Sequence, residues 1–445
     1  MNPVSSRSPG FPSNFELKER KYKHFDWPLT GQKAVDVLST ISDPNIIARH
    51  SFYPFISKSI ETKRYKAKMK RVLIKKRRIA YAAHLDAAIY QYYSGLISEL
   101  YEASLICENL TDVPVAYRRF FPSKSNLDIA NEAFTLISQL RPCVAMAFDV
   151  AGFFDNIDHS LLRTEWLNLL GCIRLPNDHQ TVMKSITRFS VVPKGAIERL
   201  FEGAPQQTVR ERSGRVCTTE EFQAKIRQGR RIHVNNNKFG IPQGSPMSGV
   251  LSNVYMLPFD KALKSYAEGL GGVVRRYSDD ILLVLPINLD SNNATDSLID
   301  QAKAFIKAAI EERKLQIQME KTELTACDAV SGIFASKKIV QYLGLTFDGQ
   351  NKRIRSQTLS RYYGRLSRCI KRAKYASLTS QGHTKIRTKT LNQKYSHLGF
   401  RNFISYAYRA AEECDSKQIR SQVARHPKVI KAMIDKKLVR KSLKR

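Results

Sequence analysis

Two adjacent carboxylates, Asp279 and Asp280, lie between two apolar runs and are the clearest candidates for chemistry in the chain. The apolar runs cover residues 272–274 and 281–285, and each reads as a strand. A short polar connection between these strands would place both carboxylates at the tip of a hairpin, where their oxygens can bind a hard divalent cation. An Asp-Asp pair is also common in solvated turns, so the neighbouring segments have to decide between the two interpretations.

Two further segments favour the metal site. In residues 144–159 an apolar strand ends at Asp149, and a turn and a helix start follow. Residues 240–256 form a Gly-, Pro- and Ser-rich loop that leads into an amphipathic helix. Taken with residues 277–280, these segments resemble, in this order, motifs A, B and C of a reverse transcriptase palm.

The resemblance extends on both sides of the three motifs and covers roughly residues 50–350. Residues 75–86 and 116–119 are similar to the fingers motifs of the superfamily, residues 315–322 to motif D, and residues 342–347 to the motif E primer grip. The chain is most similar to the bacterial defence-associated reverse transcriptases of the "unknown group" in three segments, KKRRIAYAAHLDAAIYQYY, AYRR and GIPQGSPMSGVLSNVYM.

The composition is ordinary for a globular protein, but the charge is extreme. Of the 445 residues, 42% are hydrophobic and 25% are charged, which is enough for a large core. The net charge of +33 indicates a polyanionic partner. Residues 351–445 carry 26 basic and four acidic side chains, and therefore 22 of the 33 net charges. Apolar residues at helical spacing among them favour a folded basic domain over a solvated tail.

Neither a membrane span nor a disulfide framework is expected. No apolar run reaches the length of about 18 residues that a span requires, and the first residues lack an apolar signal core. These features predict a cytoplasmic protein with no membrane partner, and the resemblance implies a bacterial one. The seven cysteines are odd in number and include no Cys-x-x-Cys pair, which argues against both disulfides and a zinc module.

The fold that the resemblance implies is a right hand of the α+β class, with fingers, a palm built on an antiparallel sheet, and a helical thumb. We expect an N-terminal arm over residues 1–59, fingers and palm over residues 60–355, and a basic helical thumb over residues 356–445. The stretch 160–239 is longer than a minimal palm requires. Two alternatives are equally open for this stretch. Either it is an elaboration that binds nucleic acid or a partner, or it is a surface insertion without a role.

The resemblance assigns metal chemistry to the carboxylates of motifs A and C. Nucleotidyl transfer joins a 3′-oxygen to an α-phosphate and releases pyrophosphate, and two Mg²⁺ ions, which Mn²⁺ can replace, stabilise the negative charge. Asp149 and Asp279 are the expected principal ligands. Asp280 completes the acidic cluster, and the carbonyl oxygen of Val150 is an extra ligand. Lys321 in motif D is expected to protonate the departing pyrophosphate.

Other residues are expected to hold the incoming dNTP. Phe154 matches the steric-gate position, where a ring would clash with a ribose 2′-hydroxyl. The alternative is that Phe153 and Phe154 are both core aromatics. Gln243 and Gly244 of motif B are expected to contact the nascent base pair, since glycine allows close backbone approach.

Basic residues of the fingers are expected to bind the triphosphate. Arg78 is the first candidate, followed by Lys76 and Arg77, and Arg118 is a further one, because the guanidinium fork suits phosphate oxygens. The expected primer grip is Tyr342, Leu343 and Gly344, and the expected duplex-binding residues are Arg365, Arg368 and Lys371.

These implications predict an RNA-directed DNA polymerase that copies a dedicated non-coding RNA into DNA for anti-phage defence. One alternative is a retron or group II intron-type reverse transcriptase, although no endonuclease or maturase addition is recognisable. The other alternative is a catalytically silent RNA-binding scaffold. The intact set of Asp149, Asp279 and Asp280 argues against the scaffold.

Overall fold

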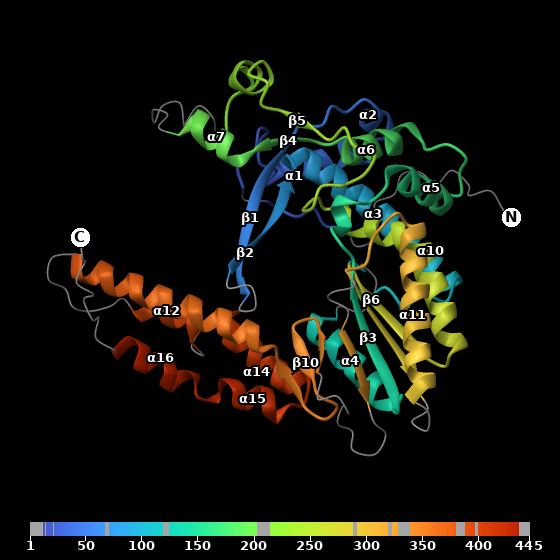
Figure 1. Ribbon diagram of the computed structural model, residues 1–445. Coiled ribbons are helices and arrows are strands. Elements are labelled where there is room, and N and C mark those ends of the chain that lie inside the picture. Colours follow the sequence, from blue (N-terminus) through green and yellow to red (C-terminus); the bar gives the residue numbers. More distant parts are fainter. Residues whose placement is uncertain are drawn as a thin grey trace.

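The chain forms an α+β right hand, as the sequence predicted (Figure 1). Fingers lie at the top of Figure 1, the palm lies on its right and the thumb at its lower left. No helix in the described part of the chain is long and apolar enough to cross a membrane. The computed structural model describes residues 12–13, 15–20, 22–66, 71–118, 124–202, 214–287, 292–318, 323–327, 339–379, 388–396 and 399–435.

The palm is a four-stranded antiparallel sheet with one helical layer on each face. Its strands, in spatial order, are β6 (Val273–Tyr277), β7 (Asp280–Pro286), β3 (Cys143–Asp149) and β8 (Glu323–Cys327). Alternate residues of β3 point to opposite faces, so Val144 and Met146 join one core and Cys143 and Ala145 another. The first core includes α10 (Ser248–Gly269) and α11 (Asn292–Glu312), and the second includes α4 (Asn126–Gln139).

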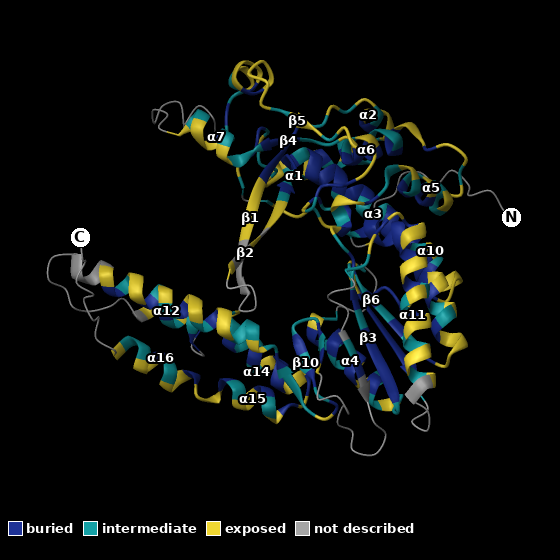
Figure 2. Ribbon diagram, in the orientation of Figure 1, coloured by how far each residue is buried: buried dark blue, intermediate teal, exposed yellow. Residues whose placement is uncertain are grey.

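The fingers are built on a second sheet whose long hairpin projects from the body (Figure 1). Its strands, in spatial order, are β2 (Arg71–Tyr81), β1 (Phe55–Lys66), β4 (Ser190–Pro193) and β5 (His233–Val234). Helix α3 (His84–Cys107) follows β2 and is buried along most of its length (Figure 2). Strands β4 and β5 come from the stretch between motifs A and B. That stretch therefore completes the fingers sheet and is more than a surface insertion.

The predicted N-terminal arm contains two helices that pack on the fingers. Asp43 caps the second helix by accepting hydrogen bonds from two backbone N–H groups, and Ile41 and Ile47 are buried in the main core. The expected boundary after residue 59 falls inside β1, because this strand already begins at Phe55. The remaining elements of the fingers and palm are α1 (Gln32–Ser42), α2 (Pro44–Ala48), η2 (Phe153–Asp155), α5 (His159–Leu170), α6 (Asn177–Thr187), α7 (Lys194–Phe201), α9 (Thr219–Glu221) and η3 (Phe222–Arg227).

The basic C-terminal region is helical, as predicted. A small antiparallel sheet precedes it, and the apolar side of its first helix packs on two later helices through Leu366, Ile370, Leu391 and Ile430. The opposite side of that helix is exposed (Figure 2). The elements are β9 (Val340–Tyr342), β10 (Leu345–Phe347), β11 (Lys352–Ile354), α12 (Ser356–Thr379), α13 (Thr388–Tyr395), α14 (Phe403–Glu413), α15 (Lys417–Ala424) and α16 (His426–Asp435).

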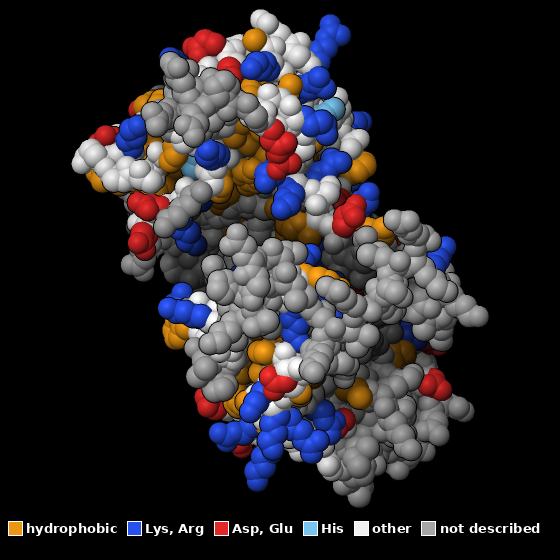
Figure 3. Space-filling model, turned by 90° about the vertical axis from the view of Figure 1, so that its left-hand side faces the viewer, with side chains coloured by type: hydrophobic (Ala, Val, Ile, Leu, Met, Phe, Trp, Pro, Cys, Tyr) orange, Lys and Arg blue, Asp and Glu red, His pale blue; other side chains and the backbone are white. Residues whose placement is uncertain are grey.

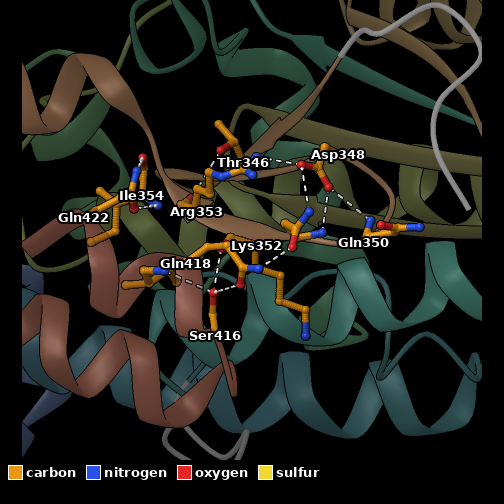
Figure 4. A network of polar contacts seen from close by, with 11 residues as sticks. Thr346, Asp348, Gln350, Lys352, Arg353, Ile354, Ser416, Gln418 and Gln422 are labelled. Atoms are coloured by element: carbon orange, nitrogen blue, oxygen red, sulfur yellow. Dashed lines mark hydrogen bonds and ion pairs between the residues drawn. The ribbon is translucent and has the colours of Figure 1, made fainter.

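A polar network ties the small sheet to the thumb helices (Figure 4). Asp348, after β10, pairs with Arg353 at 2.6 Å. Gln422 of α15 accepts from the backbone N–H of Ile354 at 2.9 Å and donates to its carbonyl oxygen at 3.0 Å. The hydroxyl of Ser416 donates to the β11 backbone at 2.7 Å. Helices α14 and α15 also share a core with α4, so the packing is continuous across the expected boundary before residue 356.

A buried ion pair joins β6 to α10. Nε and Nη2 of Arg276 each donate to a carboxylate oxygen of Asp260 at 2.6 Å, and both side chains are completely buried. Nη1 donates to the carbonyl oxygen of Ser278 at 3.2 Å and to the amide oxygen of Asn253 at 3.3 Å. Burial alone would lower the pKa of Arg276, but the Asp260 carboxylate outweighs it and raises the pKa above its ordinary value. The guanidinium therefore stays charged.

Removing one partner of this pair should destabilise the fold strongly. We expect Asp260→Ala to lower the free energy of unfolding by about 3–5 kcal/mol, because it leaves an uncompensated buried charge. Urea denaturation measures the change. The control is Lys307→Ala, which removes an exposed ion pair with Glu311 on α11 and should cost less than about 1 kcal/mol.

A double variant keeps the test decisive if Asp260→Ala does not fold. Replacing both partners, as Asp260→Leu with Arg276→Met, removes both buried charges and should recover much of the lost stability. A double variant less stable than Asp260→Ala, or an Asp260→Ala variant as stable as the control, would contradict the role of this pair.

Candidate active site

The carboxylates of residues 279 and 280 lie at a tight hairpin, as predicted. Tyr277 pairs with Asp280 across β6 and β7, so Ser278 and Asp279 form a two-residue loop. Ser278 has a φ of 58° in the left-handed region, and its side chain is buried. Asp279 is half-buried and Asp280 is exposed. The loop thus presents carboxylates at the edge of the palm sheet.

Strand β3 brings Asp149 to the same edge. The register of β3 and β7 places Asp149 directly opposite Asp280, and the backbone N–H of Val150 donates to the carbonyl oxygen of Asp279 at 3.0 Å. Among the described residues, no three acidic, His or Cys side chains form a metal-binding group on their own. A cation bound here would also need carbonyl, water or substrate oxygens, which is the coordination that Mg²⁺ favours.

The connection from β3 to α5 receives hydrogen bonds from the other motifs. The backbone N–H of Ile241, in motif B, donates to the carbonyl oxygen of Phe154 at 2.9 Å. The N–H of Gln318, in motif D, donates to the carbonyl oxygen of Asp149 at 2.8 Å. Together with the bond from Val150 to motif C, these contacts fix the backbone on both sides of Asp149.

Asp158 ends this connection and has a structural role. Its carboxylate caps α5 by accepting from the N–H groups of Ser160 and Leu161, and it pairs with Lys314 at 2.8 Å. Partial burial opposes ionisation, but these contacts outweigh it and lower the pKa of Asp158 to about 2. Asp158 therefore stabilises the start of α5.

Phe153 and Phe154 lie in different environments. Phe153 is buried in the main core, whereas Phe154 is half-buried and its ring lies edge-to-face with Tyr117 at a centroid distance of 6.3 Å. Tyr117 is 48% exposed and packs on Gly249 of α10, where a Cβ atom would lie 2.9 Å from its ring. Sequence reasoning placed Tyr117 in a fingers motif but missed its contact with Phe154, because only tertiary structure joins the two segments.

The motif B loop lies against the free edge of β2. The backbone N–H of Ala80 donates to the carbonyl oxygen of Gln243 at 2.8 Å. Gly244 has a φ of 114°, and a Cβ atom there would lie 2.6 Å from the carbonyl oxygen of Ala80 and 3.0 Å from Cγ2 of Ile79. Only glycine fits this approach between motif B and the fingers.

This contact distinguishes the basic residues of β2. Side chains alternate along an unbroken ladder, so Arg77 shares the face of Ile79, which approaches motif B. Arg78 lies on the other face, where it lines a separate cavity. Lys76 shares that second face and pairs with Glu61 at 3.3 Å. The geometry thus favours Arg77 over Arg78 for a ligand at motif B, which reverses the order expected from the sequence.

Arg118 forms hydrogen bonds inside the protein, which argues against its predicted role in triphosphate binding. Two of its guanidinium nitrogens, Nε and Nη2, donate to the carboxylate of Glu102. Nη1 donates to the carbonyl oxygens of Thr111 and Pro114 at 3.0 Å. The side chain is only 4% exposed. The guanidinium nitrogens of Arg118 therefore already donate hydrogen bonds to groups of the protein itself.

The expected primer grip is a tight turn. Leu343 and Gly344 connect β9 to β10 with φ values of 46° and 92°, while Tyr342 is buried. Burial raises the pKa of Tyr342, and its hydroxyl has no hydrogen-bond partner among the described residues. The predicted proton donor Lys321 lies outside the described residues.

The expected duplex-binding residues share the exposed side of α12. Arg365, Arg368 and Lys371 are exposed, while Leu366 and Ile370 are buried against the thumb core. The helix therefore presents a row of cations away from its packed side, which is the arrangement that phosphate binding requires.

Comparisons with known proteins agree with this geometry. Residues 106–347, more than half of the chain, match the family model described as reverse transcriptase (RNA-dependent DNA polymerase). The chain therefore belongs to the reverse transcriptase family, a family of nucleotidyltransferases. No curated protein sequence gave a match.

The chain also has distant structural relatives. It is similar to apo telomerase from Candida tropicalis with 11% identity, covering 87% of this chain and 59% of that one, at a TM-score of 0.45. Candida albicans telomerase with a TWJ fragment of telomeric RNA is 11% identical, the match covers 89% of this chain and 59% of that one, and the TM-score is 0.42. The RNA-dependent RNA polymerase of a human picobirnavirus is 11% identical, the match covers 67% of this chain and 43% of that one, and the TM-score is 0.34. The chain spans about 60% of the length of apo Candida tropicalis telomerase truncated from its C-terminal domain.

Proposed function

We propose that the protein is an RNA-directed DNA polymerase that extends a DNA strand on an RNA template by metal-dependent nucleotidyl transfer. The opposition of Asp149 to Asp280, with Asp279 bonded to Val150, carries this proposal. Carboxylates from two adjacent strand ends converge at one solvent-accessible edge of the palm. Such an edge can bind hard cations together with a triphosphate, and membership in the reverse transcriptase family supports this reading.

The residues present fit a divalent-metal site. Asp149 and Asp279 would be the principal ligands, with Asp280 beside them. The carbonyl oxygen of Val150, which follows Asp149 at the end of β3, would be an extra ligand. Two bound Mg²⁺ ions, or Mn²⁺ in their place, would stabilise negative charge on the attacking and leaving oxygens. Arg276 would support the site by holding the Ser278 carbonyl and hence the loop.

The nucleotide would lie between motif A, motif B and the β2 edge. Arg77 is on the face of β2 that approaches Gly244 and would bind phosphate oxygens. Phe154, held by the motif B backbone and edge-to-face with Tyr117, would lie beneath the sugar and exclude a 2′-hydroxyl. Gln243 would contact the nascent base pair.

The acidic cluster gives the first test. Replacing Asp279 and Asp280 together by Ala should abolish dNTP incorporation on an RNA template, because the metal loses its motif C ligands. Thermal unfolding should be little changed, since neither side chain is part of the core. The control is Asp155→Ala, an exposed acidic residue of the same region, which should keep its activity. Undiminished Mg²⁺-dependent synthesis by the double variant would refute the assignment.

Single-nucleotide incorporation tests the nucleotide site. Arg77→Ala should raise the KM for dNTP by about tenfold or more, since a charge-assisted hydrogen bond contributes about 1.5–3 kcal/mol. Arg78→Ala, the matched control from the other strand face, should change it less than about threefold. Phe154→Ala should increase rNTP relative to dNTP incorporation by removing the clash. Equal effects of the two arginine variants, or unchanged sugar selectivity, would contradict the respective role.

We further propose a dedicated non-coding RNA as template and anti-phage defence, in the bacterial cytoplasm, as the biological role. The support is the similarity of residues 75–93, 116–119 and 240–256 to the defence-associated reverse transcriptases. Sequencing the RNA that copurifies with the protein should yield one strongly enriched species. A heterogeneous population that reflects RNA abundance in the cell would contradict the dedicated template.

A further inference from the structure

Tyr117 is an exposed aromatic residue in a backbone conformation that tyrosine rarely adopts. Its φ is 56°, in the left-handed region, and its side chain is 48% exposed. A positive φ is costly for a bulky residue, and strained positions gather at functional sites. A ring that is half in solvent adds little to the apolar core. Burial therefore gives no reason for the strain at Tyr117.

The residues on both sides of Tyr117 are held by hydrogen bonds. The carbonyl oxygen of Ala116 accepts from the side-chain amide of Asn253, on α10, at 2.8 Å. Arg118 donates to the carboxylate of Glu102 and to two backbone carbonyl oxygens. Neither set of bonds uses the side chain of Tyr117. The neighbouring residues thus fix the place from which the Tyr117 ring projects.

The Tyr117 ring lies against both motif B and motif A. A Cβ atom at Gly249, in the first turn of α10, would lie 2.9 Å from Cγ of Tyr117 and 3.0 Å from Cδ1, which leaves no room for a larger residue. On the motif A side, the ring meets Phe154 at a centroid distance of 6.3 Å and an interplanar angle of 68°. Edge-to-face pairs of this kind are favourable beyond the area that they bury. Tyr117 thus connects Gly249 to the proposed steric gate.

Open space lies next to this contact. Tyr117 lines a cavity of about 540 Å³, whose other walls come from the N-terminal arm, α3 and the motif B loop. Phe154 is half-buried, and it also contacts the ring of the buried Phe153 at 5.4 Å. If the Tyr117 ring were removed, Phe154 would border the cavity on that side. A ring beside open space is free to adopt other rotamers.

We propose that Tyr117 is a positioning residue for sugar selection, because its ring holds Phe154 in the arrangement that excludes a ribose 2′-hydroxyl. The inference rests on the proposed function, in which Phe154 is the gate. The motif B bond at Phe154 uses its backbone carbonyl oxygen and does not fix its ring. Two rings from separate segments, residue 117 of the fingers and residue 154 of motif A, would therefore select the sugar together.

Single-nucleotide incorporation of dNTP and rNTP tests the proposal. Tyr117→Ala should lower the ratio of kcat/KM for dNTP over rNTP by about three- to tenfold, in line with the strength of an aromatic pair. The change should come from faster use of rNTP, with kcat/KM for dNTP within about threefold of the wild type. Tyr117→Phe keeps the ring and should keep the ratio. A general folding defect would lower both rates and leave the ratio unchanged.

A double variant shows whether Tyr117 acts through Phe154. In Phe154→Ala the gate is gone, so Tyr117→Ala has nothing left to position. The double variant should therefore have the same ratio as Phe154→Ala alone. Additive losses would show that Tyr117 contacts the nucleotide independently, and they would overturn the positioning role. A wild-type ratio in Tyr117→Ala would overturn it as well.

Gly249→Ala tests the same contact without removing the ring. The new Cβ atom would displace Tyr117 and should lower the ratio in the same direction. The matched control is Gly269→Ala, at the other end of α10, where a Cβ atom would meet nothing within 4 Å. This control should keep the wild-type ratio. If Tyr117→Ala does not fold, Gly249→Ala decides the test, and a wild-type ratio in it would overturn the proposal.

Failure of the proposed function would appear differently. A wild type that incorporates no dNTP on an RNA template would refute the polymerase activity, and this inference with it. Unchanged sugar selectivity of Phe154→Ala would refute the gate before any Tyr117 variant is made. Anisotropy should show wild-type binding of a labelled template–primer by every variant, because the Lys and Arg side chains spread over the face in Figure 3 all stay in place.

Discussion

The buried ion pair between Arg276 and Asp260 is the constraint on which the arrangement of the palm depends. Removing two charges from water costs free energy, which good hydrogen-bond geometry between them must offset. Two hydrogen bonds of 2.6 Å therefore fix the position of the two side chains relative to each other. The same guanidinium holds the carbonyl oxygen of Ser278, inside the loop that carries Asp279. Asn253 adds a bond to Arg276 and another to the carbonyl oxygen of Ala116. One side chain thus sets the position of the motif C loop relative to α10 and the segment before Tyr117.

Motif A is held from three directions, and this explains how carboxylates from distant segments can share a site. Val150 bonds to motif C, Phe154 accepts from motif B, and Asp149 accepts from motif D. All these bonds use backbone groups, so they fix the position of the chain without using the side chains of Asp149 and Phe154. A site built on strand ends is more rigid than one built on long loops.

Side chains of the fingers hairpin alternate between its two faces. One face of β2 carries Arg77 and Ile79 next to motif B, and the other carries Arg78 next to a cavity that Lys58 and Lys194 also line. Because a strand has a period of two residues, neighbouring arginines in one basic run lie on opposite faces of the hairpin. A run of like charges in the sequence is therefore no guide to which of them act together.

Local patterns in the sequence predict the strand ending at Asp149, the hairpin around Asp279 and the helical basic C-terminal region. Hydrophobic periodicity and turn residues encode these features, since they depend on neighbours along the chain. Tertiary structure alone decided which side chains are available. Arg118 pairs with Glu102, Arg77 shares the face of β2 that approaches motif B whereas Arg78 lies on the other face, and Tyr117 contacts Phe154 across separate elements. Burial and pairing depend on residues far away in the sequence, and no local pattern records them.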